Sequence, residues 1–132
     1  MNSKAQRDFA ITKKGKDFWC EPVWKTIHIF AASLRPGGGE AYKTFLTVCL
    51  PVLLPCEECC KNLYKKLELL PPDAYMGNNH DAFFYSYVLH DMVTEHINED
   101  HPEVPPKVTP NFDDVKAYYF GCLSQECKGC NV

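Results

Sequence analysis

The sequence predicts an all-α protein, a four-helix bundle with a short fifth helix and an irregular C-terminal tail. Apolar residues recur at spacings of three and four along four segments, and proline or glycine separates these segments. No segment shows the alternating pattern of a β-strand. The 132 residues, 45% hydrophobic and 23% charged, have the size and composition of one globular domain.

The first two helices are expected at 22–34 and 40–53, with the breaker sequence Arg35-Pro36-Gly37-Gly38-Gly39 between them. Proline is tolerated in the first turn of a helix, so Pro22 fits the start of the first one. Pro51 removes a hydrogen bond and should kink or fray the last turn of the second. The inward residues of the second helix are expected to be Tyr42, Phe45, Leu46, Cys49 and Leu50. Cys49 is therefore predicted to be a buried, unreactive thiol.

The third and fourth helices are expected at 56–70 and 79–98. The third carries a leucine stripe and ends before Pro71-Pro72. One face of the fourth is formed by Phe83, Tyr87, His90, Thr94 and Ile97. A proline-rich linker at 102–110 precedes short helical turns at 113–120, and the tail from Gly121 is expected to be irregular.

Three parts of the chain are expected: a basic, partly disordered segment at 1–17, a helical domain at 18–121 and a cysteine-rich tail at 122–132. The formal net charge of −3 argues against nucleic-acid binding. No signal peptide follows Met1, and the longest apolar run, 48–54, is too short to cross a membrane. We therefore expect neither standard secretion nor membrane insertion.

Eight cysteines without a secretory signal indicate metal binding or thiol redox chemistry. Two residues separate Cys56 from Cys59, so both sulfurs can lie on adjacent turns of one helix face. Pro55 places Cys56 at a helix N-terminus, where unpaired N–H groups and the macrodipole stabilise a thiolate. This spacing is typical of zinc sites as well as of redox pairs, and by itself it leaves both open.

A second pair, Cys127 and Cys130, lies near the C-terminus in polar surroundings that predict a mobile dithiol shuttle. Alternatively, both pairs together form a tetrahedral Cys₄ zinc site in an interaction module without catalytic activity. A third hypothesis is a thiol–disulfide carrier without flavin, and the absence of thioredoxin-like strands argues against it. Among the other cysteines, Cys20 and Cys122 are candidates for a structural bridge, and Cys60 is expected to point away from the Cys56/Cys59 face.

Three segments, in this order, resemble the Erv/ALR family of FAD-linked sulfhydryl oxidases. Residues 19–28, with Trp24 and His28, are similar to the family's Trp-x₃-His on helix one. Leu54-Pro55-Cys56-Glu57-Glu58-Cys59 resembles its Pro-Cys-x-x-Cys at the start of helix three. Residues 85–94 are similar to its helix-four pattern Trp-x₄-His-Asn-x-Val-Asn. The match covers approximately 19–98, and the ordered combination is more specific than any single motif.

The resemblance implies a sulfhydryl oxidase in which Cys56 is attacked from outside, Cys59 faces the flavin, and oxygen is reduced to hydrogen peroxide. It implies thiol-containing protein substrates or a thioredoxin-like carrier as electron donors, and a homodimer. The residues that it places around FAD are Trp24, His28, Cys59, Tyr85, His90, Asp91, Val93, Thr94 and Ile97.

The sequence departs from the family pattern at several of these positions. Cys20 replaces a glycine, Tyr85 replaces the helix-four tryptophan, and Asp91 and Thr94 replace asparagines. Expected basic residues are replaced by His96 and Glu99, for which Lys61, Lys65 or Lys66 are candidate substitutes near the flavin phosphates. These departures and the lack of a targeting signal resemble members from large cytoplasmic DNA viruses. We therefore expect host cytoplasm or virion rather than the mitochondrial intermembrane space.

Overall fold

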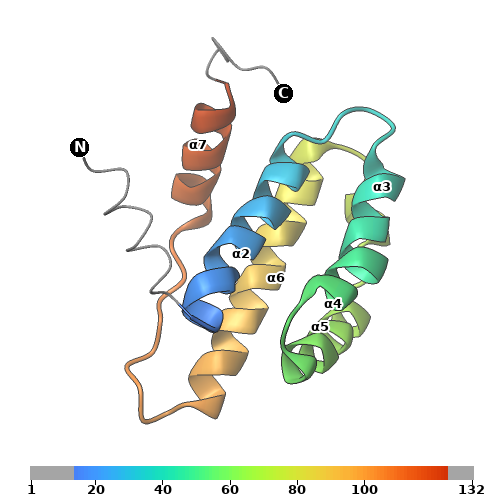
Figure 1. Cartoon of the computed structure of the whole chain (residues 1–132). Coiled ribbons are helices and arrows are strands. Elements are labelled where there is room, and N and C mark those ends of the chain that lie inside the picture. The colour runs from blue at the N-terminus through green and yellow to red at the C-terminus, as the bar shows by residue number, and fades with distance from the viewer. Residues whose placement is uncertain (1–13, 125–132) are drawn as a thin grey trace, which may run out of the picture.

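The computed structural model describes residues 14–124, and no strand occurs among them, which confirms the all-α prediction. The helical elements are α2 (Lys16–Ala32), α3 (Gly39–Thr44), the π-helical turn η1 (Phe45–Cys49), α4 (Leu50–Leu53), α5 (Glu57–Leu69), the 3₁₀ turn η2 (Asp73–Tyr75), α6 (Asn79–Asp100) and α7 (Phe112–Leu123). Helices α2 and α6 run antiparallel through the centre, with α7 on one side and α3, α4 and α5 on the other (Figure 1).

Helix α2 begins six residues before the predicted start, at Lys16 instead of Pro22, so this predicted boundary was wrong. Pro22 lies inside the helix and removes one backbone hydrogen bond, to the carbonyl of Phe18. Phe18 is exposed, so water can satisfy this carbonyl. Helix α2 consequently starts inside the segment at 1–17 that the sequence predicted to be basic and partly disordered.

The predicted second helix is a continuous helical run from Gly39 to Leu53, with a π-helical turn in its middle. The N–H of Leu50 bonds to the carbonyl of Phe45, five residues earlier, just before Pro51. This wider turn keeps Tyr42, Leu46 and Leu50 buried at a constant spacing of four, and Cys49 is rotated into solvent. The prediction of a buried Cys49 was therefore wrong, because it assumed a regular α-helical period.

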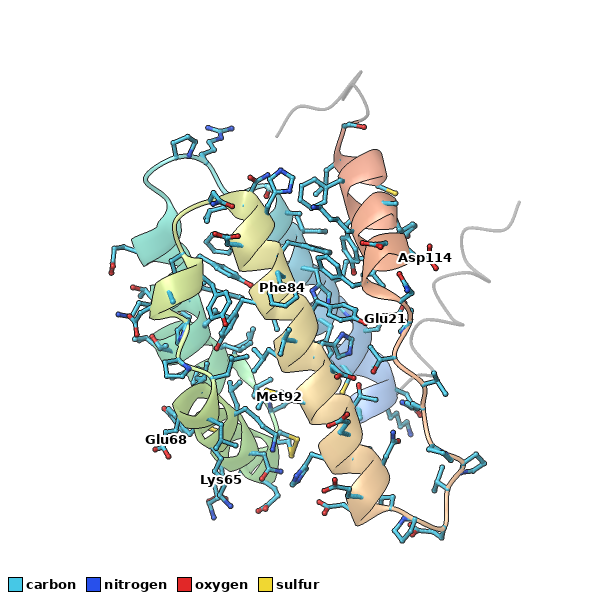
Figure 2. The ribbon with its side chains drawn as sticks, turned by 180° about the vertical axis from the view of Figure 1, so that it is seen from behind. Glu21, Lys65, Glu68, Phe84, Met92 and Asp114 are labelled. Atoms are coloured by element: carbon cyan, nitrogen blue, oxygen red, sulfur yellow. A yellow bond between two sulfur atoms is a disulfide. The ribbon has the colours of Figure 1, made fainter. Side chains whose placement is uncertain are left out.

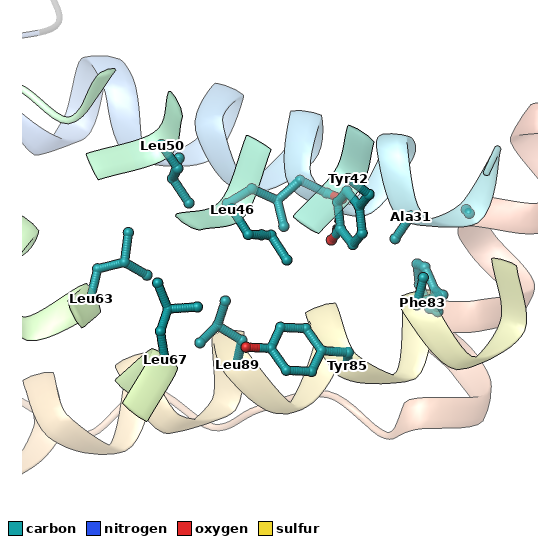
Figure 3. Close-up of a cluster of buried hydrophobic side chains, with 12 residues drawn as sticks. Ala31, Tyr42, Leu46, Leu50, Leu63, Leu67, Phe83, Tyr85 and Leu89 are labelled. Atoms are coloured by element: carbon teal, nitrogen blue, oxygen red, sulfur yellow. Dashed lines mark hydrogen bonds between the residues drawn. The ribbon is translucent and has the colours of Figure 1, made fainter. Parts of the chain in front are cut away.

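The core lies between α2, the run from α3 to α4, α5 and α6 (Figure 3). Its fully buried aromatic residues include two tyrosines whose hydroxyl groups are satisfied. Tyr42 donates to the carbonyl of Ile27 over 3.1 Å, and Tyr85 donates to the carbonyl of Leu70 over 2.7 Å. Burial raises the pKa of both phenols, so both remain neutral hydrogen-bond donors.

Helix α7 is longer than the predicted turns at 113–120, and it includes Gly121 and Cys122, which were assigned to the irregular tail. Asn111 caps it by accepting from the N–H groups of Asp113 and Asp114. Its aromatic residues Phe112, Tyr119 and Phe120 pack against Phe83 of α6. These tertiary contacts, added to the cap, extend the helix beyond what its own pattern indicated.

Candidate active site

The candidate active site begins at the N-terminus of α5. Cys56 is the N-cap residue, and its Sγ accepts from the N–H of Cys59 over 3.2 Å. A disulfide joins Cys56 and Cys59, whose Cα atoms are 5.1 Å apart. Pro55 precedes this cap, as the sequence predicted. The first-turn N–H groups and the macrodipole of α5 therefore stabilise negative charge on Cys56 Sγ whenever the disulfide opens.

Cys59 lines a cavity of about 200 Å³ between α2, α5 and α6. Most of the wall is apolar, and it includes two indole rings, which suits a flat aromatic ligand. The apolar lining residues are Trp19, Val23, Trp24, Ile27, Leu50, Leu54, Leu63, Val93 and Ile97. Cys56 is not among the lining residues, so the two sulfurs of the disulfide have different environments.

The polar part of the cavity wall carries groups of both signs. Lys16 and Lys66 are basic and Glu58 and Asp100 are acidic, and the remaining polar lining residues are Asn62, His96 and His101. His96 Nε2 lies 3.0 Å from the Asp100 carboxylate. Lys66 is thus the one predicted lysine that lines the cavity. Lys61 pairs with Glu57 at 3.8 Å, and Lys65 projects outward from α5 (Figure 2). Lys16 was missed because the sequence interpretation started the first helix after it.

Four predicted cofactor contacts line the cavity, namely Trp24, Cys59, Val93 and Ile97. The other five, Tyr85, His28, His90, Asp91 and Thr94, do not line it. Tyr85 is buried in the core, and Asp91 accepts a hydrogen bond from Thr109 of the linker. The structure therefore separates the predicted set into a cavity wall and a second group behind it.

The second group is centred on two histidines that hydrogen-bond to each other. Ser86 Oγ donates to the carbonyl of Phe83 over 2.7 Å, so its oxygen must accept from His28 Nδ1–H, 2.9 Å away. His28 Nε2 is then an acceptor, and His90 Nδ1–H donates to it over 3.1 Å. This chain of bonds requires a neutral His28, because its Nε2 must keep a lone pair to accept from His90.

Burial maintains that neutral state. Desolvation, with a smaller effect of His90, lowers the pKa of His28 to about 3. Desolvation also lowers the pKa of His90 to about 4, with Lys107 acting in the same direction and Asp91 opposing. The indole of Trp24 stacks on His90, with ring centroids 4.0 Å apart and planes 9° from parallel. The histidine pair thus supports the cavity wall through Trp24.

Ser86 is a site residue that the sequence interpretation missed. It is fully buried and anchors the end of the histidine chain. One signal existed, because Ser86 lies four residues before His90 and therefore shares its helix face. A serine at this spacing has many other roles, so the signal is weak.

Cys20 lines the cavity from α2, and burial raises the pKa of its thiol, although Lys16 and Lys107 oppose this shift. The candidate bridge between Cys20 and Cys122 was wrong, since both are free. The ring of His28 contacts Tyr119 on the parallel helix α7. Cys20 lies two turns before His28, and Cys122 lies one turn after Tyr119, so their separation exceeds the roughly 7 Å that a disulfide tolerates.

Among residues 14–124, no group of three or more His, Cys, Asp or Glu side chains could hold a metal ion. Cys127 and Cys130, the other half of the predicted zinc site and the predicted shuttle, lie outside the described residues. In the same part of the chain, no helix is both long and apolar enough to cross a membrane. No family model matches the chain, and no curated protein or solved structure is significantly similar to it.

Proposed function

We propose that the protein is an FAD-linked sulfhydryl oxidase that forms disulfides in protein substrates and passes the electrons to oxygen. One observation carries the proposal: the disulfide at the start of α5 has Cys59 at the wall of an apolar cavity and Cys56 at the helix N-cap. The three ordered motifs of the Erv/ALR resemblance support the same function.

The residues around the cavity fit a flavin ring. Trp24, Val93 and Ile97 offer apolar surfaces, and Cys59 offers a sulfur at the same wall. The cavity of about 200 Å³ is below the roughly 300–1,000 Å³ of whole-ligand pockets, so it would hold only a part of FAD. Lys16 and Lys66 in the cavity wall would supply positive charge for a diphosphate. A bound flavin supplies two-electron oxidation of a dithiol and transfer of those electrons to oxygen.

The two cysteines divide the thiol chemistry. A substrate thiolate attacks Cys56 Sγ, the disulfide breaks, and its electron pair passes to Cys59 Sγ at the cavity wall. A second substrate thiolate then attacks the sulfur that is joined to Cys56. Cys56 leaves as a thiolate that the α5 N-terminus stabilises, although Glu57 and Glu58 oppose this charge. The substrate loses two electrons, and Cys56 and Cys59 gain them.

The first test is the spectrum and oxygen consumption of the purified protein. We expect a yellow protein with flavin absorbance that consumes oxygen when dithiothreitol is added. Cys59→Ser should abolish oxidation of every thiol substrate, because the electron pair has no acceptor at the cavity wall. A colourless protein with stoichiometric zinc would instead support the Cys₄ interaction module.

Cofactor binding has a readout that does not depend on turnover. Cys20 lines the cavity, whereas Cys49 and Cys122 are exposed elsewhere. FAD should therefore slow alkylation of Cys20 by at least about tenfold and leave Cys49 and Cys122 unchanged, as measured by peptide mass spectrometry. Equal rates at Cys20 with and without FAD would contradict a flavin in this cavity.

The C-terminal pair completes the proposal. Substitution of both Cys127 and Cys130 should spare dithiothreitol oxidation and slow oxidation of a protein substrate or a thioredoxin-like carrier. Equal losses on small and protein thiols would show that the pair is not a shuttle. The resemblance supports a homodimer as the active form, and sedimentation should give the mass of a dimer. It also supports a viral source.

A further inference from the structure

Building on the proposed function, we infer that the substrate segment presented to Cys56 is an apolar peptide with a basic residue beside its cysteine. Its docking surface is an exposed apolar ridge formed by Val48, Cys49, Val52 and Leu53, which leads along the chain to the disulfide.

The ridge is unusual because it is apolar, continuous and exposed. Val48, Val52 and Leu53 keep 59%, 85% and 55% of their surface in contact with solvent. Val48 and Val52 are four residues apart, as are Cys49 and Leu53, so the four side chains cover two adjacent turns of one helix face. The π-helical turn that rotates Cys49 outward creates this face. Contiguous exposed apolar surface of this kind marks interaction sites.

The position of the ridge indicates a thiol substrate. Leu53 is followed by Leu54, exposed Pro55 and then Cys56, so the ridge ends within three residues of the sulfur that the substrate must reach. Thiol–disulfide exchange requires in-line contact between sulfurs. A peptide held on the ridge would deliver its own thiolate to Cys56 Sγ at high effective concentration. A small dithiol such as dithiothreitol does not bind along the ridge, so the ridge should not raise its rate of reaction with Cys56.

The charge beside the ridge selects the kind of peptide. Glu57 and Glu58 occupy the first turn of α5, and Lys61 approaches Glu57 to 3.8 Å with both side chains largely exposed. No Lys or Arg lies between Val48 and Glu58. A second copy of this surface would bring the same two glutamates against their counterparts, and residues 48–58 offer no cation to meet them. A substrate with Lys or Arg next to its cysteine would instead bring the positive charge that complements Glu57 and Glu58.

The experiment compares two synthetic dithiol peptides that have the same leucine-rich segment but two lysines or two glutamates beside the first cysteine. Single-turnover reduction of the Cys56–Cys59 disulfide is followed without oxygen, as the loss of peptide thiols. The second-order rate constant for the lysine peptide should exceed that for the glutamate peptide about fivefold at low salt, and added salt should reduce this ratio. Equal rate constants would overturn the inference.

Matched variants locate the effect. Val52→Asn should lower the rate constant for the lysine peptide about tenfold relative to that for dithiothreitol, because it places a polar amide in the apolar contact without adding charge. Leu69→Asn, at a leucine on α5 that is 73% exposed, is the control and should change neither rate constant. Glu57→Gln should reduce the preference for lysine, and the control Glu68→Gln should not.

Two outcomes distinguish a substrate-docking ridge from a dimer contact and from the oxidase activity itself. If Val52→Asn dissociates a dimer and the two peptides react equally, the ridge is a contact between copies and the inference fails. The exchange step needs no flavin. A colourless protein that retains the lysine preference would therefore contradict the oxidase proposal and support the docking ridge. A yellow, oxygen-consuming protein without the preference would support the oxidase proposal and contradict the docking ridge.

Discussion

The two halves of α6 have the same secondary structure and opposite roles. In the first half, Phe83, Tyr85, Ser86 and Leu89 are fully buried. In the second half, Val93 and Ile97 are half-buried and line the cavity. Apolar residues occur in both halves, so hydrophobicity alone does not separate them. One half belongs to the packed core, and the other borders a cavity.

The difference comes from what covers each half. Helix α7 packs its aromatic residues on Phe83 and closes the first half. Beside the second half runs the linker that returns the chain to α7, fastened to Asn98 by two hydrogen bonds with the Lys107 backbone. On the opposite side of α6, Tyr85 and Leu89 belong to the packed core, whereas Val93 and Ile97 border the cavity between α2, α5 and α6. A close-packed interior and an open cavity thus follow one another on a single helix.

Lowering the pH should reduce the unfolding free energy through the buried pair His28 and His90. The His28 and His90 pKa values in the folded protein, about 3 and about 4, are depressed below an unfolded value of about 6.5. Their stabilising effect is therefore full above pH 6.5 and is lost as pH falls. Each histidine should lower the unfolding free energy by about 2 kcal/mol when the pH falls from 7 to 5. Urea unfolding across this range tests it, and a His28→Gln/His90→Gln variant should show a flatter profile.

Truncation of one aliphatic side chain in each half of α6 compares how closely the two halves are packed. Leu89→Ala leaves a cavity in close-packed surroundings and should cost about 3 kcal/mol of unfolding free energy. Ile97→Ala, eight residues later on the same face, enlarges an existing cavity and should cost about 1 kcal/mol. Similar losses for the two variants in urea unfolding would show that both halves are packed alike.

Ser86→Ala tests the polar chain inside the packed half. Removal of the hydroxyl leaves His28 Nδ1–H without its acceptor in a buried position. We expect a loss of about 2 kcal/mol of unfolding free energy. Ser86→Thr keeps a hydroxyl group and is the matched control. If Ser86→Ala is as stable as the wild type, the proposed tautomers of the histidine pair are wrong.

A larger side chain in the cavity should make the second half of α6 as closely packed as the first. Val93→Phe adds an aromatic ring at the wall and should raise the unfolding free energy by about 1 kcal/mol. The same variant should lose FAD binding, as measured by equilibrium dialysis. An unchanged FAD affinity would place the cofactor elsewhere, whatever the change in stability.

The sequence determined the features that depend on local chemistry. Periodic apolar residues and proline boundaries predicted the four main helical segments, and Pro55 predicted Cys56 at the start of α5. Capping, proline geometry and helical periodicity act within a few residues, so they can be read along the chain. The adjacent turns that join Cys56 to Cys59 follow from the same local geometry.

Tertiary structure decided which side chains meet. It rotated Cys49 outward through a π-helical turn, placed Cys20 in the cavity wall and buried Tyr85 in the core. It also set the histidine pair behind Trp24 instead of in the cavity. Each outcome depends on contacts from elements that are distant in sequence, and a helix pattern specifies a face without specifying what covers it.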